Sequence, residues 1–193
     1  MDKVSYYVEY IVSLFEQIGP MGGFILVMLE SILPPLPLGV IVGFNMISFG
    51  KLFGFIMSYI ATILGCVLSF VLFRYLFKGK FTKHFSKKNQ DSINKWKNKL
   101  TNIKLPTLAI LVALPVTPSF AVNIAAGLSD MSLRKFIVAI CVGKPAMLFF
   151  YGYIAVSVME SLKDPMNLVK VLALMIGVYV ISKIVEKVVK VEK

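Results

Sequence analysis

The chain has 193 residues, of which 58% are hydrophobic and 16% are charged, and its mean hydropathy is +0.80. Soluble domains carry about 25% charged residues, so this composition excludes a disordered chain and argues against a soluble globular fold. At about 20 residues per membrane span, the length allows four or five passes and no additional soluble domain. The sequence therefore predicts an all-α integral membrane protein in which residues 1–193 form a single membrane domain.

The first segment, residues 1–19, predicts an amphipathic helix. Apolar side chains recur at helical spacing over residues 4–18, and Glu9 and Glu16 share one face. This helix either lies in the membrane interface or crosses the bilayer packed against other helices, and it ends at a Gly-Pro pair. Because the glutamates interrupt the apolar run and no small-residue cleavage site follows, we expect no cleaved signal peptide.

Residues 21–77 predict a broken apolar segment followed by an unbroken one. Three prolines interrupt the run over residues 21–49: Pro34, Pro35 and Pro37. Proline removes a backbone donor and clashes with the preceding helical turn, and half-helices of ~13 residues are too short to cross ~30 Å of hydrocarbon. We therefore expect a re-entrant hairpin, which enters and leaves on one side, with a kinked full span as the alternative. Residues 52–77 predict a transmembrane helix.

A basic connector over residues 78–104 separates this first half from a second one that follows the same plan. The connector holds nine lysines and one aspartate, and its later half predicts a short interfacial helix. Within residues 105–160, Pro115 and Pro118 cut an apolar run, and residues 133–160 then predict a full span. Residues 166–193 add a last span and a tail of Lys and Glu.

The two halves indicate an internal repeat. Each break contains P-x-x-P and is followed by a glycine, Gly43 in the first half and Gly127 in the second. Short, proline-interrupted segments at matching positions of two halves are typical of transporters with binding sites at the repeat interface. Chance similarity between two apolar, proline-containing runs is the alternative.

The lysines predict the orientation, because cytoplasmic loops carry an excess of Lys and Arg. The connector and the C-terminal tail are then cytoplasmic, so the first hairpin opens outward and the second opens inward. The halves are inverted, and their proline tips are expected near the midplane, where broken backbone must be buried in protein or line a wet cavity. The predicted location is a cell membrane, as a multi-pass protein of the bacterial plasma membrane.

Two charged residues fall deep inside the predicted membrane segments, away from the segment ends, where each costs at least ~2.5 kcal/mol unless it is paired, neutralised or hydrated. Glu30 precedes the first break, and Lys144 lies near the middle of the second full span. Glu30 is either a proton-exchanging acid or a structural carboxyl bonded to loose amides of the break. Lys144 is its candidate partner, a ligand for a lipid phosphate, or a lysine that snorkels to the interface.

Other candidate residues lie near the two breaks. Arg74, in the last turn of the first full span, is either an interface anchor or a phosphate ligand. Thr117 and Asn123 either cap freed amides or line a cavity. The remaining candidate cavity residues are the five break prolines and the glycine after the second break: Pro34, Pro35, Pro37, Pro115, Pro118 and Gly127.

Few residues are available for metal or catalytic chemistry. Cys66 and Cys141 lie singly in apolar runs, and His84, the one histidine, is in the connector. The motifs G-x-S-x-G and H-E-x-x-H are lacking. We therefore expect no metal, no cofactor, no enzymatic activity and no nucleic-acid partner.

These residues resemble the DedA superfamily, in the branch with the VTT or SNARE-associated domain. The first half shares with it an acid, the proline break, a glycine and a turn: Glu30, Pro34–Pro37, Gly43 and Phe49–Gly54. The second half shares the pattern P-x-x-P-S-F-x-x-N-x-x-x-G over residues 115–127, and then further positions in the next span: Phe136, Gly143, Pro145, Tyr151 and Gly152. The resemblance covers about residues 20–155. The chain departs from it at Leu111–Leu114, where that family carries an arginine, whose role is absent here or falls to Lys144.

The resemblance implies two opposed re-entrant hairpins and flippase-like or scramblase-like movement of phospholipids or undecaprenyl phosphate. We accordingly expect a lipid transporter whose partners are membrane lipids. Proton exchange on Glu30 is a candidate driving force. A homo-oligomer is compatible with this function. The alternatives are a proton-coupled transporter of a small solute or ion, a scaffold that transports nothing, and a membrane enzyme that would have to use Glu30 and Lys144.

Overall fold

The structure is a computed structural model that describes these residues: 3–33, 37–76, 98, 100–115, 117, 119–161, and seven positions between 173 and 183. Pro34, Pro35 and Pro118 lie outside the described residues, as do most of the basic connector and most of the predicted last span. The described residues contain helices and no strand, which confirms the all-α class for this part of the chain.

The main helices lie close to the predicted segments. Their bounds are α1 (Lys3–Glu30), α2 (Leu38–Ser48), α3 (Lys51–Tyr75), α5 (Leu105–Ala113), α6 (Ser119–Leu128) and α7 (Leu133–Ser161). Helices α1, α3 and α7 each contain an apolar stretch long enough to cross a membrane: Glu9–Glu30, Lys51–Tyr75 and Leu133–Val158. The shorter helices α2 and α6 are apolar but below that length.

Helix α1 consists of two helices joined at Gly19, where the backbone is not helical (φ 68°, ψ 177°). A positive φ favours glycine, and the fixed φ of Pro20 suits the first turn of the helix that follows. The second part of α1 ends at Glu30, and α2 begins after Pro37, so the helical chain is interrupted where the prolines predict.

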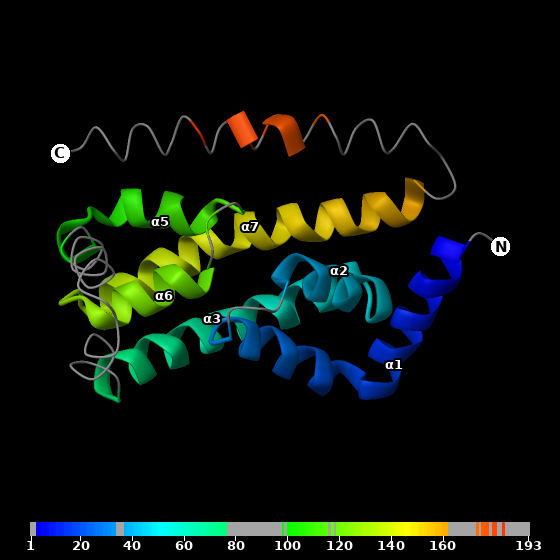
Figure 1. Cartoon of the computed structure of the whole chain (residues 1–193), viewed down its shortest axis with the longest axis horizontal. Coiled ribbons are helices and arrows are strands. Elements are labelled where there is room, and N and C mark those ends of the chain that lie inside the picture. The colour runs from blue at the N-terminus through cyan, green and yellow to red at the C-terminus, as the bar shows by residue number, and fades with distance from the viewer. Residues whose placement is uncertain are drawn as a thin grey trace, which may run out of the picture.

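The two long helices, α3 and α7, run antiparallel along the length of the molecule and pack against each other (Figure 1). Helices α1 and α2 lie at one end of this pair, and α5 and α6 lie at the other end. Helices α1 and α2 form one pair, and α5 and α6 form the other. The first helix of each pair contacts the long helix that follows in the chain, since α1 packs on α3 and α5 packs on α7. The second members reach the long helix of the other half, since α2 packs on α7 and α6 packs on α3.

Glycines permit the closest of these approaches. A Cβ added at Gly43 in α2 would overlap Ala155 in α7, and a Cβ at Gly127 in α6 would lie 2.7 Å from the carbonyl oxygen of Phe70 in α3. Small residues let backbones approach closely within a membrane, where helix association depends on packing because lipid tails are as apolar as the side chains. The glycine after each proline break therefore sets the contact between one half and the long helix of the other.

Two apolar clusters fill the interior, one at each end. The first joins α5 and α6 to the long helices, and Phe70 of α3 stacks on Phe136 of α7 with ring centroids 4.8 Å apart. The second joins α1 and α2 to the long helices through Val27, Val42 and Leu148, among other residues. The outer faces are apolar as well, with a stripe of exposed side chains along α3: Leu52, Ile56, Ile60, Leu64 and Leu68. Apolar side chains on both faces of a helix are typical of a membrane span.

Candidate functional site

A set of buried polar side chains lies where the two apolar clusters meet. On α7 this junction falls at Lys144, between Ile140 of the first cluster and Met147 of the second. Helices α1, α3, α6 and α7 each contribute to this junction, and one of its residues, Ser31, directly follows α1. All of its polar residues are buried: Glu30, Ser31, Thr62, Ser119, Asn123 and Lys144. Burying polar groups is costly unless they are bonded, so their partners indicate what the site does.

Lys144 is 1% exposed and reaches the N-terminal end of α6. Its Nζ donates a hydrogen bond of 2.6 Å to Oγ of Ser119 and lies 3.5 Å from Sδ of Met147. It does not snorkel out of the protein, which is one of the alternatives that the sequence leaves open. Ser119 is the first residue of α6, so the ammonium is held beside the second proline break.

Pro145, which follows Lys144, leaves a carbonyl of α7 without its usual helical donor, because proline has no N–H. That carbonyl belongs to Cys141, and the hydroxyl of Tyr59 in α3 donates to it over 3.0 Å. The proline is therefore accommodated within a continuous α7 by a bond from the other long helix.

Glu30 is the last residue of α1 and is 6% exposed. Its carboxyl interacts electrostatically with Lys144. The short hydrogen bond of Lys144, however, is donated to Ser119 and not to Glu30. Oε2 of Glu30 is buried without a hydrogen-bond partner in the described structure. The structure thus brings the two predicted charges into one buried region without a direct ion pair between them.

Asn123, in α6, contacts the residue that follows the end of α1. Its Nδ2 donates to the carbonyl oxygen of Ser31 over 3.1 Å and to Sγ of Cys66 over 3.4 Å. The carbonyls after a helix end lack intrahelical partners, so this amide caps the residue that follows α1. The sequence leaves open the capping of freed amides or the lining of a cavity, and the bond seen here, to a carbonyl, is a different contact from either.

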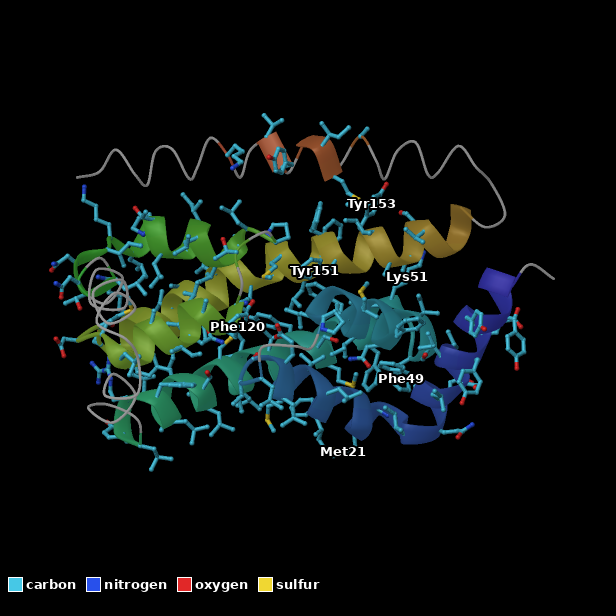
Figure 2. All side chains as sticks on the ribbon, in the orientation of Figure 1. Met21, Phe49, Lys51, Phe120, Tyr151 and Tyr153 are labelled. Carbon is cyan, nitrogen blue, oxygen red and sulfur yellow. The ribbon has the colours of Figure 1, made fainter. Side chains whose placement is uncertain are left out.

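Tyr151 lies between the two breaks. Its hydroxyl donates a 2.6 Å hydrogen bond to the carbonyl oxygen of Pro115, and its ring packs so closely on Gly39 of α2 that a Cβ there would lie 2.9 Å from it. Figure 2 shows Tyr151 on the side of α7 that faces the interior, whereas Tyr153 points away from it. Lys144 and Tyr151 are seven residues apart on α7, so they share one face of the helix.

An apolar groove of about 470 Å³ leads along α2 and α7 to Tyr151. Pro37 lies at this end of α2, and Val40, Phe44, Ile154 and Val158 are among the other lining residues. The groove extends from the exposed Val40 on the outer apolar face to Pro37 of the first break.

Arg74 lies away from this region, at the C-terminal end of α6. Its Nε donates to the carbonyl oxygen of Gly127 (3.1 Å), and Nη2 donates to those of Ala126 (3.2 Å) and Ser129 (2.7 Å). A cation favours the negative end of the helix dipole and satisfies carbonyls that lack helical donors. The guanidinium also lies over the ring of Phe70, 4.3 Å from its centroid. Through these contacts Arg74 caps the C-terminal end of α6.

The remaining predicted residues occupy separate positions. Pro37 is the exposed residue before α2, Pro115 accepts the bond from Tyr151, and Thr117 is half-buried with its N–H bonded to the carbonyl oxygen of Leu114. Gly127, in α6, packs closely against α3. Among the described residues, no cluster of His, Cys, Asp and Glu is large enough to hold a metal ion.

Sequence reasoning does not single out Ser119, Tyr59 or Tyr151 as site residues. The heptad spacing from Lys144 is a signal for Tyr151, and the position of Ser119 just after a proline break is typical of a helix start. The bond from Tyr59 depends on how α3 and α7 pack, which local sequence does not specify.

Comparison with known proteins gives two matches. The VTT domain family matches residues 33–157. The chain is 30% identical over 182 residues to the uncharacterized membrane protein YhjE of Bacillus subtilis (strain 168), an alignment that covers 93% of this chain and 87% of that protein. No solved structure gives a significant match.

Proposed function

Because this chain belongs to the VTT-domain branch of the DedA superfamily, we propose that it is a membrane lipid transporter, which moves a phospholipid or undecaprenyl phosphate across the bilayer in a flippase-like or scramblase-like manner. The observation that carries this proposal is the apolar α2/α7 groove lined by Tyr151, a residue that interacts electrostatically with the buried Glu30. A lipid has the same two-part character, an acyl chain for the groove and a polar headgroup for the charged region.

The proposed path uses both parts together. The acyl chain stays in the groove between α2 and α7, in contact with the bilayer, while the headgroup moves along the polar side chains between the two breaks. Lys144 and the N-terminal end of α6 are the positive groups for a phosphate, because a helix N-terminus presents unpaired amides to an anion. Lys144 thereby takes the place of the arginine that the family carries near residues 111–114.

An inverted repeat of two re-entrant hairpins is part of the proposal. It is supported by the reciprocal packing of the short helices on the long ones and by the matched close contacts of Gly43 and Gly127. A second matched pair is Gly65 on α3 against α1 and Gly143 on α7 against α5. In this arrangement the basic connector and the C-terminal tail are cytoplasmic, and the two breaks open to opposite sides of a plasma membrane.

Single-cysteine labelling tests the arrangement. In a Cys66→Ser, Cys141→Ala background, cysteines at Leu33 and Thr117 should react with membrane-impermeant reagents from opposite sides. Reaction of both from one side contradicts the inverted repeat without touching the lipid-transport proposal.

Glu30 is the proposed proton site. Its Oε2 lacks a hydrogen-bond partner, and its interaction with Lys144 makes the charge of the region depend on whether the acid is protonated. A phosphate that approaches Lys144 competes with the Glu30 carboxylate, so protonation of Glu30 favours phosphate entry.

The transport proposal is tested with purified protein in liposomes that contain a fluorescent phospholipid or a fluorescent polyprenyl phosphate, assayed for movement between leaflets at two pH values. We expect faster movement of at least one of the two lipids with protein than without, and loss of its pH dependence in Glu30→Gln. If neither lipid moves while a small solute or ion is taken up in exchange for protons, the alternative of a proton-coupled solute transporter replaces this one.

A further inference from the structure

A second groove, of about 480 Å³, lies between the start of α3 and the C-terminal half of α7. It is separate from the α2/α7 groove, because it shares no lining residue with it and is lined by Tyr153 rather than Tyr151. Its walls are mostly apolar and include Leu52, Phe55, Phe149 and Val156.

Lys51 is the charged residue of this lining. It is exposed and is the first residue of α3, and Figure 2 shows its side chain near the C-terminal part of α7. Gly50, which precedes it, has a φ of 90° and supplies no side chain to cap α3. The positive end of the helix dipole therefore adds to the lysine charge at this end of the groove.

An apolar groove with a cation at one end is complementary to an anionic phospholipid. Lys51 is the first residue of a candidate membrane span, where a phosphate group lies at headgroup depth, and the groove continues from there along the apolar part of α3 and α7. A lysine near the membrane surface attracts anionic lipid by about 1 kcal/mol.

The charges favour a lipid over a segment of this chain. The apolar stretch that follows α7 in sequence, residues 166–185, carries two lysines and no acid. That stretch would add positive charge to a groove that already holds Lys51, whereas the phosphate of a phosphatidylglycerol adds the opposite charge.

We propose that the α3/α7 groove binds one anionic phospholipid, with an acyl chain between Phe55 and Phe149 and the phosphate at Lys51. The bound lipid braces α3 against α7 and is not the transported one. The site rests on α3 and α7 crossing the bilayer, and it does not depend on the proposed transport activity.

The test measures the thermal stability of the purified protein in a neutral detergent, titrated with phosphatidylglycerol or phosphatidylcholine. Phosphatidylglycerol should stabilise the wild type at lower concentration than phosphatidylcholine does. Lys51→Gln should weaken the apparent affinity for phosphatidylglycerol about fivefold and weaken that for phosphatidylcholine less, because the choline cation offsets the charge of its phosphate. Lys135→Gln is the matched control, because Lys135 is in the first turn of α7 and does not line the groove.

Equal responses of the wild type to the two lipids, or equal losses in Lys51→Gln and Lys135→Gln, overturn the proposal. A photoactivatable phosphatidylglycerol provides a second measurement on the unaltered protein. It should label the peptide that contains Leu52 and Phe55, and Val156→Trp, which fills the groove, should reduce that label more than Val138→Trp does. Absence of label from that peptide, or equal labelling of it in Val156→Trp and Val138→Trp, contradicts the site.

Discussion

Nζ of Lys144 donates a hydrogen bond of 2.6 Å to Oγ of Ser119, so the middle of α7 is bonded to the first residue of α6. This bond holds a buried ammonium at the second proline break, while Glu30, at the end of α1, interacts with the same charge from beside the first proline break. The two halves of the molecule therefore share one charged centre, and a substitution of either residue should change the electrostatic environment of the other.

The first prediction concerns that coupling. Glu30→Gln leaves the Lys144 ammonium without its counter-charge, whereas Lys144→Met leaves an acid that can accept a proton. Breaking a direct buried ion pair costs about 3–5 kcal/mol when one partner remains charged. Glu30 and Lys144 interact without direct contact, so Glu30→Gln should cost less than this and still lower thermal stability more than Lys144→Met. The double variant should regain much of the loss and should not regain transport. Thermal denaturation of the three purified variants decides this, and strictly additive losses would show that the two charges act independently.

The second prediction separates capping from phosphate binding at Arg74. Arg74→Gln removes three donor contacts to the end of α6 and should cost about 2 kcal/mol of stability. The relative rates for lipids of different headgroup should stay the same in the folded fraction. Arg134→Gln, at an exposed arginine, is the control and should change neither quantity. A change in headgroup preference with unchanged stability would assign Arg74 to the lipid path.

The third prediction concerns the contact between Gly43 and Ala155. Gly43→Ala places a Cβ where Ala155 already lies, and overpacking of this kind costs about 1–3 kcal/mol. Ala155→Gly, introduced into the Gly43→Ala protein, should restore most of the stability because it vacates that space. If the second substitution adds to the loss, α2 and α7 do not meet at these residues.

The fourth prediction concerns Tyr151. Tyr151→Phe keeps the ring in the groove but removes the bond to Pro115, so it should cost about 1 kcal/mol of stability and slow transport. Tyr153→Phe is the matched control, since Tyr153 lies two residues away and points to the other side of α7 (Figure 2). Equal effects of the two substitutions would remove Tyr151 from the path.

The positions of the helices can be predicted from the sequence, because they follow from the prolines, the glycines and the lengths of the apolar runs. The Gly19-Pro20 pair and the interruption before Leu38 are local signals that need no tertiary information. The hydrogen-bond partners of the buried polar residues cannot be predicted in this way. Arg74 carries the signature of an interface anchor, and its capping of α6 depends on the packing of α6 against α3. Likewise, the sequence places Lys144 in the membrane, but its bond to Ser119 depends on how two distant segments meet.

The most direct test of the lipid-transport account is the rate of lipid movement between leaflets in liposomes that contain Val40→Trp. Val40 is exposed and lines the α2/α7 groove, so the larger ring should obstruct an acyl chain while leaving the buried charges untouched. Val142→Trp, at an exposed position of α7 outside that groove, serves as the control. The account predicts a rate at least tenfold lower than wild type (about 1.4 kcal/mol) for Val40→Trp and a wild-type rate for Val142→Trp. A wild-type rate in a folded Val40→Trp protein would contradict the groove as the lipid path.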